Sequence, residues 1–305
     1  MLWDGDELAA VFPLQVRGHR LRPLANEHTP FVGPLARSPQ ALAVLMQGIL
    51  DEWGSLSLAP VFRDVPATGQ LLDTLGRGSR WAYVEEKGGS PVVRTSGSLA
   101  EYMAQLSGNA RRDFRRLRRL LAGVPDVEIA ALVEPEDLER ELSDGFAIEG
   151  SHWKTRRGTA ILDSAATTTF YRDVAARFAA LGKLRLSRLS FGDRPAAFNL
   201  NLLDGGRVWG LKGGYDPAYA RFAPGMLLLL AEIERCFELG LDALELLGSE
   251  DPWKRKFTRE AHPVVQVHAY SFGTLPLFTY GYRRLVRPRL RAVYRRLPRP
   301  AHARR

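Results

Sequence analysis

One loop of the sequence combines aromatic, acidic and basic side chains with a proline and a glycine. It reads Tyr215-Asp216-Pro217-Ala218-Tyr219-Ala220-Arg221-Phe222-Ala223-Pro224-Gly225, and an apolar helical pattern follows it. Proline at the first helical position favours a helix start, and glycine lets a ligand approach the backbone. The amides of Gly225, Met226 and Leu227 would then favour an anion such as a pyrophosphate, with Arg221 adding a charge-assisted contact. An ordinary helix start with a solvated Arg221 is the alternative, and spacing alone slightly favours it.

A second chemical feature is the acid inside the apolar stretch 243–247. Glu245 lies in this predicted strand, and an unpaired acid there would cost free energy. Glu245 is therefore a candidate functional carboxylate, and a buried ion pair with Lys or Arg is the alternative. Lys254 follows Trp253 and could lie at a pocket rim, although most lysines are simply solvated. Cys236, the only cysteine, falls at a core-facing helical position and is not expected to be a nucleophile.

The elements that must position these residues follow from periodicity and from turn signals. Mostly antiparallel strands with one strand–helix–strand crossover predict an α+β fold. A Gly-Val-Pro sequence at 123–125 predicts a boundary between two halves, residues 1–123 and 124–270, with a tail at 271–305. Helices are predicted at 39–53, 66–75, 98–121, 135–149, 164–181 and 224–239, with Ser107-Gly108-Asn109 as a candidate interruption of the third. Strands are predicted at 14–24, 56–62, 80–84, 91–94, 127–133, 184–190, 196–203, 207–211, 243–247 and 264–270, with a turn at Gly88-Gly89 and a loop at 212–223.

The basic charge of the chain is unevenly placed. The net charge is +9, but ten of the 43 basic residues are arginines in 283–305, which leaves 33 basic against 34 acidic residues elsewhere. Between these arginines the apolar residues recur with helical period, and an aromatic-rich stretch precedes them. This pattern suits an anionic membrane surface, and a solvated terminal helix is the alternative. A nucleic-acid partner is not expected because the tail lacks a recognisable binding motif. A second cluster of six arginines lies within 111–119.

Composition excludes several classes of protein. The chain has 305 residues, of which 45% are hydrophobic, so it can bury a core and is not disordered. One cysteine excludes a disulfide scaffold and any metal site built from several cysteines. No apolar run approaches the ~20 residues of a spanning helix, and the N-terminus is acidic. These features predict a soluble, cytoplasmic protein without a metal site.

Together, the loop 215–225 and the segment 245–254 resemble the CelD/BcsL-type acyltransferase family, a branch of the GNAT superfamily related to the FemABX peptidyltransferases. The family pattern is Tyr-Asp, a short gap, Ser-Pro-Gly, a helix, Asp-Phe-Leu, a glycine-containing turn and Tyr-Lys. It appears here as Tyr215-Asp216, Ala223-Pro224-Gly225, Glu245-Leu246-Leu247 and Trp253-Lys254, so Ala223, Glu245 and Trp253 depart from it. Trp153-Lys154 with Gly158 and the helix around 111–119 also look like the family, and the similarity covers about residues 100–260.

This resemblance implies tandem GNAT-like domains, the first of them degenerate. It also implies an acyl-CoA or acyl-carrier donor whose phosphates meet the 221–227 loop, with Phe222, Ala223, Gly225, Met226 and Leu227 among the donor-binding residues. The acyl group would pass to an amine, or less often to a hydroxyl. Such a site requires positioning, loss of the amine proton and stabilisation of the oxyanion, but no enzyme nucleophile.

The residues that could supply this chemistry are few. Glu245 and Glu149 are candidate bases, and His152 is a third because its ordinary pKa suits proton transfer near neutrality. Lys254 could bind the acceptor or the oxyanion. The candidate substrate-binding residues are Trp153, Tyr215, Asp216 and Trp253, although Tyr215 and Asp216 could instead only order the loop.

Three functions remain open from the sequence. The first is an acyl-CoA-dependent N-acyltransferase acting on an amino sugar, an amino acid or a sphingoid-type amine, with the tail favouring a substrate at the inner face of the membrane. A FemABX-like aminoacyl transferase that uses charged tRNA is the second; the basic helix around 111–119 and the tail support it, although no coiled-coil arm is found between the halves. The third is a non-catalytic accessory protein of polysaccharide assembly.

Overall fold

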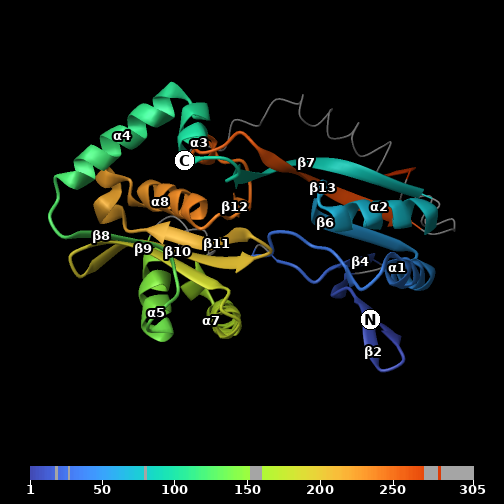
Figure 1. Ribbon diagram of the computed structural model, residues 1–305. Coiled ribbons are helices and arrows are strands. Elements are labelled where there is room, and N and C mark those ends of the chain that lie inside the picture. The colour runs from blue at the N-terminus through green and yellow to red at the C-terminus, as the bar shows by residue number, and fades with distance from the viewer. Residues whose placement is uncertain (18–19, 27, 79–80, 152–159, 271–280, 283–305) are drawn as a thin grey trace, which may run out of the picture. The chain divides into compact units, whose positions relative to one another are not determined.

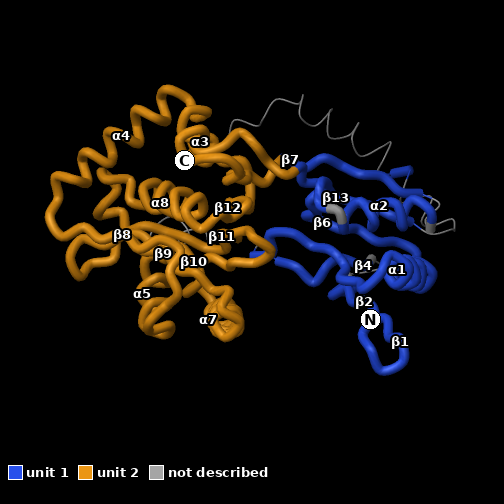
Figure 2. Tube along the Cα trace, in the orientation of Figure 1, with its two compact units in different colours: residues 1–88, 263–305 blue, residues 89–262 orange. Residues whose placement is uncertain are grey.

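The computed structural model describes residues 1–17, 20–26, 28–78, 81–151, 160–270 and 281–282. The chain forms two compact units, residues 1–88 with 263–305 and residues 89–262 (Figure 2). The predicted boundary at 123/124 lies inside the second unit. A division of the chain into tandem domains at that point therefore stays a proposal.

In the described part of unit 1, α1 and α2 pack on a sheet. Its strand order is β3-β4-β6-β13-β7, and a separate small sheet has the order β1-β2-β5. The core buries Leu45 and Met46 from α1 against Leu58 of β6 and Val265 of β13. The elements are β1 (Leu2–Asp4), β2 (Glu7–Val11), β3 (Leu14–Arg17), β4 (Arg20–Pro23), β5 (Leu35–Ala36), α1 (Pro39–Trp53), β6 (Ser55–Phe62), α2 (Pro66–Gly78), β7 (Trp81–Arg94) and β13 (Ala261–Tyr270).

Unit 2 is a sheet with helices on both faces (Figure 1). Its strand order is β7-β12-β11-β10-β9-β8, and all neighbours with a defined register are antiparallel except β11 and β12. Helices α5 and α7 pack on one face, and α8 with α4 packs on the other. The elements are α3 (Leu99–Gln105), α4 (Gly108–Ala122), β8 (Val127–Val133), α5 (Leu138–Glu149), η1 (Ile161–Asp163), α7 (Ala165–Ala180), β9 (Leu184–Phe191), β10 (Arg194–Asp204), β11 (Arg207–Tyr215), η2 (Pro217–Phe222), α8 (Pro224–Glu238), β12 (Ala243–Glu245) and η3 (Lys254–Lys256).

The ends of the helices follow local capping rules. The Ser38 side chain caps α1 by accepting from the Ala41 N–H, Pro39 follows it, and Gly54 ends the helix with φ of 67°. Ser98 and Glu101 form a reciprocal capping box at α3, and Ser107 caps α4. These serines explain why the predicted helix 98–121 is two helices. The predicted α+β fold, with mostly antiparallel sheets flanked by helices, is confirmed.

The prediction of a turn at Gly88-Gly89 is wrong, because β7 runs straight through both glycines. A Cβ at Gly89 would lie 2.8 Å from the Cβ of Ala261 and 2.9 Å from the Glu250 carboxylate. Glycine is therefore needed here for the close approach of a neighbouring segment, and not for a reversal of the chain. The predicted loop 212–223 also differs, since β11 continues to Tyr215 and η2 follows.

Candidate functional site

An irregularity in β11 organises the site. Leu200 of β10 pairs with Lys212, whereas Asn201 pairs with Gly210, so Leu211 is an extra residue in β11. Such a bulge changes the direction of the side chains beyond it. On the other side of β11, the parallel pairing with β12 ends at Trp209 and Glu245, while β11 runs on to Tyr215. The last residues of β11 thus lie beyond the end of β12.

Glu149, the last residue of α5, lies against this end of β11. Its side chain is fully buried, and Oε2 accepts from the Ile161 N–H at 2.9 Å. The Nζ of Lys212 lies 3.6 Å from Oε1, and it lies 5.4 Å from the centre of the Tyr171 ring. Gly214 is in close contact, since a Cβ there would lie 2.7 Å from the Cα of Glu149. A buried carboxylate at the end of a strand is a candidate general base, and the ammonium group of Lys212 positions it.

Tyr171 and Cys236 are buried groups near acidic side chains. Burial raises the pKa of Tyr171, and the charge of Glu149 raises it further. Burial also raises the pKa of Cys236 to about 12, with a smaller contribution from Glu232. A thiol with that pKa is protonated at neutral pH, so Cys236 is a poor nucleophile, as we expected.

The first turn of α8 lies beside the end of β11. Ala223, the residue before the helix, has φ of 49° and ψ of 52°, and its side chain makes no cap. A Cβ at Gly225 would lie 3.5 Å from Cδ1 of Tyr215, so the strand end and the helix start are in contact. The structure therefore brings together Glu149, Tyr215 and Gly225 at one end of β11.

The expectation of three free amides at this helix start is wrong in part. The N–H groups of Met226 and Leu227 both donate to the carbonyl of Ala223, at 3.0 and 3.2 Å. The left-handed backbone of Ala223 points its carbonyl into the first turn, which satisfies these donors. Among the described residues, the Gly225 N–H has no hydrogen-bond acceptor. An anion at this helix start would therefore meet one free amide. The side chain of Leu227, another predicted donor-binding residue, is buried.

The rest of the 215–225 loop is ordered by its own side chains. Asp216 caps η2 by accepting from the Ala218 N–H at 2.9 Å, so it orders the loop. Tyr219 stacks on Phe191 with ring centres 4.6 Å apart, and Phe222 is buried beside them. Arg221 is exposed, with its guanidinium 4.5 Å from the centre of the Phe222 ring.

Glu245 is held in a buried ion pair. It is 0% exposed, and Oε1 accepts from Nη1 of Arg207 at 2.6 Å. The ring nitrogen Nε2 of His262 lies 3.0 Å from Oε2. The ion pair with an arginine that was the alternative for this residue is present, and a role of Glu245 as a base stays a prediction. Along β11, Glu245 pairs with Trp209 whereas the backbone of Glu149 contacts Gly214, so the backbones of these two residues meet β11 at points roughly 15 Å apart.

Trp253 and Lys254 follow β12 in the chain, at the start of η3. The Nζ of Lys254 donates to the carbonyls of Leu247 at 2.5 Å and Ser249 at 3.1 Å, and the residue is 7% exposed. Burial lowers the pKa of Lys254, while Asp251 opposes that shift. Trp253 is 45% exposed. Lys254 therefore holds the loop after β12, far from Glu149. His152 and Trp153 lie outside the described residues.

The sequence analysis missed Lys212 and a buried acid on α8. The carboxylate of Glu232 is 1% exposed and accepts from Nδ2 of Asn199 at 3.0 Å and Nδ2 of Asn201 at 2.7 Å. Burial raises the pKa of Glu232, against hydrogen bonds from Ser187 and these two amides. The sequence feature that could have identified Glu232 was an acid among the apolar residues of the predicted helix 224–239. Lys212 gave no signal, because only the bulge turns it towards Glu149.

The part of the chain that holds this site is similar to a known family. Residues 108–255 match the family model of the acetyltransferase (GNAT) domain. The matched region begins with α4 and includes Glu149, the 215–225 loop and Glu245. No curated protein matches the chain in sequence.

Solved structures resemble the whole chain. The C-terminal domain of a putative lysylphosphatidylglycerol synthetase from Agrobacterium fabrum has a TM-score of 0.59 at 10% identity, covering 91% of this chain and 86% of that one. L-PGS from Bacillus licheniformis has a TM-score of 0.55 at 12% identity, with the same shares. FemX has a TM-score of 0.56 at 10% identity, covering 93% of this chain and 89% of its own. At these identities the likeness shows the fold alone, a GNAT-like fold.

Proposed function

We propose that the protein is an acyltransferase of the CelD/BcsL type, which moves an acyl group from an acyl-CoA or acyl-carrier thioester to an amine. The observation that carries the proposal is the Glu149 carboxylate beside Lys212 at the end of β11, inside the matched region. The amine nitrogen would form a bond to the thioester carbon, and the carbon–sulfur bond would break. Glu149 would take the amine proton, and the thiolate would leave and be protonated.

The donor phosphates are proposed to lie at the start of α8. The free Gly225 N–H and the positive end of the helix would bind a phosphate oxygen there, and the exposed Arg221 would pair with it. Tyr215 and Phe222 would lie beside these phosphates. The Arg-rich segment 283–305 supports an acceptor, such as a lipid amine, presented at an anionic membrane surface.

The test is a donor titration. Release of free CoA from acyl-CoAs of increasing chain length is measured with a panel of amines. We expect Arg221→Ala to raise KM for the donor several-fold while kcat changes little. The matched control is Arg177→Ala, an exposed arginine on α7. Equal KM values for Arg221→Ala and wild type would remove the phosphate assignment, and absence of turnover with every thioester would remove the thioester donor.

A second donor is favoured by the structural comparisons. FemX and the two lysylphosphatidylglycerol synthetases resemble both units of the chain. The name lysylphosphatidylglycerol synthetase points to transfer of an amino acid, and the sequence resemblance to the FemABX peptidyltransferases agrees with it, which supports an aminoacyl-tRNA donor for this chain as well. Ribonuclease treatment distinguishes the two proposed donors, because it would abolish transfer from aminoacyl-tRNA and leave transfer from acyl-CoA intact.

A further inference from the structure

Helix α4 carries an exposed cluster of arginines that the proposed acyl transfer does not use. Six arginines lie within its 15 residues, together with one acid, Asp113. That acid is already paired with Lys256 at 2.7 Å. Arg118 pairs with Glu234, and Arg112 donates to Asn109. Among the described residues, the remaining four form no ion pair within 4 Å, although the charge of Arg116 acts on Asp113: Arg111, Arg115, Arg116 and Arg119.

These arginines are unfavourable for the helix itself. Arg111 and Arg112 lie near the positive N-terminal end of α4, whose first turn holds no acid. Arg111 with Arg115, and Arg112 with Arg116, are like charges four residues apart, an arrangement that destabilises a helix. The apolar face of α4 is buried through Ala110, Phe114, Leu117 and Leu121, so folding does not require the charges. A binding role explains their presence.

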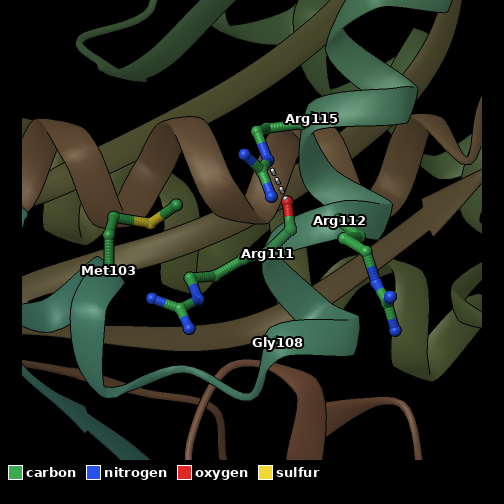
Figure 3. A pocket seen from close by; sticks show the side chains of 5 residues that line it. All are labelled: Met103, Gly108, Arg111, Arg112 and Arg115. Carbon is green, nitrogen blue, oxygen red and sulfur yellow. Dashed lines mark hydrogen bonds between the residues drawn. The ribbon is translucent and has the colours of Figure 1, made fainter.

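A hollow lies at the beginning of this helix. It has a volume of about 470 Å³ and is lined by Met103, Gly108, Arg111, Arg112 and Arg115. Figure 3 shows the side chains of Arg111 and Arg115 on the side of α4 that faces Met103 of the neighbouring α3, whereas the side chain of Arg112 points away from Met103. The Nε of Arg115 donates only to the backbone carbonyl of Arg111, at 3.4 Å. The hollow thus combines an apolar wall with guanidinium groups, which suits a phosphate and the flat group attached to it.

The arginines form a track that leads towards the proposed donor site. Ala110 and Phe114 pack with Leu229, Leu230 and Phe257, whereas Leu117 and Leu121 pack with Leu227 and Leu228. Helix α4 therefore crosses α8 so that its last turn lies beside the first turn of α8. From Gly108 to Leu121 the helix rises roughly 20 Å. One phosphate group would occupy a small part of that length, whereas a chain of phosphates would occupy all of it.

We infer that α4 and its hollow bind the phosphodiester backbone of a nucleic acid, specifically single-stranded RNA. A strand presents phosphates in series and flat bases, which match the row of guanidiniums and the Met103 wall. An anionic membrane fits less well because a bilayer surface cannot enter a hollow, and the apolar side of α4 is buried. From the sequence, no nucleic acid was expected to bind the tail for lack of a recognisable motif, whereas the basic helix around 111–119 supported the alternative of a transferase that uses charged tRNA. The binding site is independent of the proposed acyl transfer; that RNA carries the acyl group rests on the proposed function.

The experiment measures binding of the full chain to a short fluorescein-labelled single-stranded RNA by fluorescence anisotropy over a range of salt concentrations. The double variant Arg111→Ala/Arg115→Ala removes two charges of the track. The control Arg140→Ala/Arg177→Ala removes two exposed charges from α5 and α7, on the other face of the sheet. Every protein retains the Arg-rich tail, so the comparison isolates α4. Alanine is the best helix former, and circular dichroism confirms that α4 is intact.

We expect the control to bind as wild type does. The α4 variant should bind more weakly, and its plot of log affinity against log salt should be less steep by about 1.4, because each contact to a single strand contributes about 0.7. Equal slopes for the α4 variant and the control would overturn the inference. Loss of binding to phosphatidylglycerol vesicles without any change in RNA binding would assign α4 to a membrane and overturn it as well. Neither readout requires turnover, so a failure of the proposed acyl transfer leaves the result interpretable.

Discussion

Glu149 is the residue whose surroundings best fit a catalytic base. It is buried, it lies beside Lys212, and it meets the strand end where the candidate donor site begins. Glu149→Gln keeps an oxygen for the Ile161 N–H but cannot accept a proton. We expect kcat to fall by about 10²–10⁴-fold with a smaller change in donor KM. The measurement is steady-state turnover over a pH range, and the matched control is Glu139→Gln, an exposed acid of the same helix. Turnover that Glu149→Gln leaves within twofold would exclude the base role.

Glu245 should behave differently. Its carboxylate is enclosed by Arg207 and His262, so Glu245→Gln leaves buried donors with a weaker acceptor. We expect the free energy of unfolding to fall by about 1–3 kcal/mol, with kcat per folded molecule nearly unchanged. Urea unfolding and active-site titration measure the two effects, and Glu250→Gln is the exposed control. A large loss of kcat at unchanged stability would restore Glu245 as a base.

The sequence predicted these two acids better than it predicted their partners. An acid inside an apolar strand can be recognised from the sequence alone, and Glu245 was recognised in this way. Lys212 lay in a segment interpreted as a loop, and its approach to Glu149 depends on the extra residue Leu211. Lys254 looked like a rim lysine, yet two backbone carbonyls hold it. Partners that come from other elements cannot be identified from spacing along one chain.

At the scale of elements, α8 packs a buried acid against the sheet. Burial raises the pKa of Glu232, so the folded state binds more protons than the unfolded state above the ordinary pKa of a glutamate. Stability therefore falls as pH rises from that ordinary pKa through the raised folded value. Glu232→Gln removes this proton uptake. We expect the free energy of unfolding of the variant, relative to wild type, to increase with pH in urea titrations between acidic and neutral pH. A difference that does not change with pH would show that Glu232 titrates normally.

The joint between η2 and α8 gives a second prediction at this scale. Ala223 adopts a left-handed conformation, which costs roughly 1 kcal/mol for a residue with a Cβ. Glycine avoids that cost but gains freedom in the unfolded chain, so Ala223→Gly should stabilise the protein by about 0.5 kcal/mol. Thermal unfolding measures the shift. The control is Ala220→Gly in η2, where φ is not positive and where glycine should destabilise. A lower melting temperature for Ala223→Gly would contradict the expected relief of strain.

Elements with their own stop signals were predicted well. The extent of α1 follows from Ser38, Pro39 and Gly54, and the split between α3 and α4 follows from Ser107. The course of β7 could not be predicted from local signals, because Gly89 allows a close contact with residues more than 150 positions away in the chain. Local chemistry sets helix ends, whereas close approach between distant segments decides whether a glycine pair turns or continues.

At the scale of the whole molecule, charge is divided between the folded body and the tail. The body has the fold shared with the solved structures, while ten arginines lie in 283–305. In the part of the chain that the structure describes, no helix is long and apolar enough to cross a membrane. Any attachment of these described parts to a bilayer through charge would depend on basic residues, each contributing about 1 kcal/mol near an anionic surface.

Truncation after Tyr282 tests this division. The shortened chain has 33 basic and 34 acidic residues, so its net charge becomes −1 instead of +9. We expect it to lose cosedimentation with phosphatidylglycerol vesicles at low salt and to keep its turnover on a water-soluble amine, because every proposed catalytic residue lies before the cut. Neutral phosphatidylcholine vesicles are the control, since they should bind neither form. Undiminished binding of the truncated chain to anionic vesicles would place the membrane contact on the folded body, where the exposed arginines of α4 would be the next candidate.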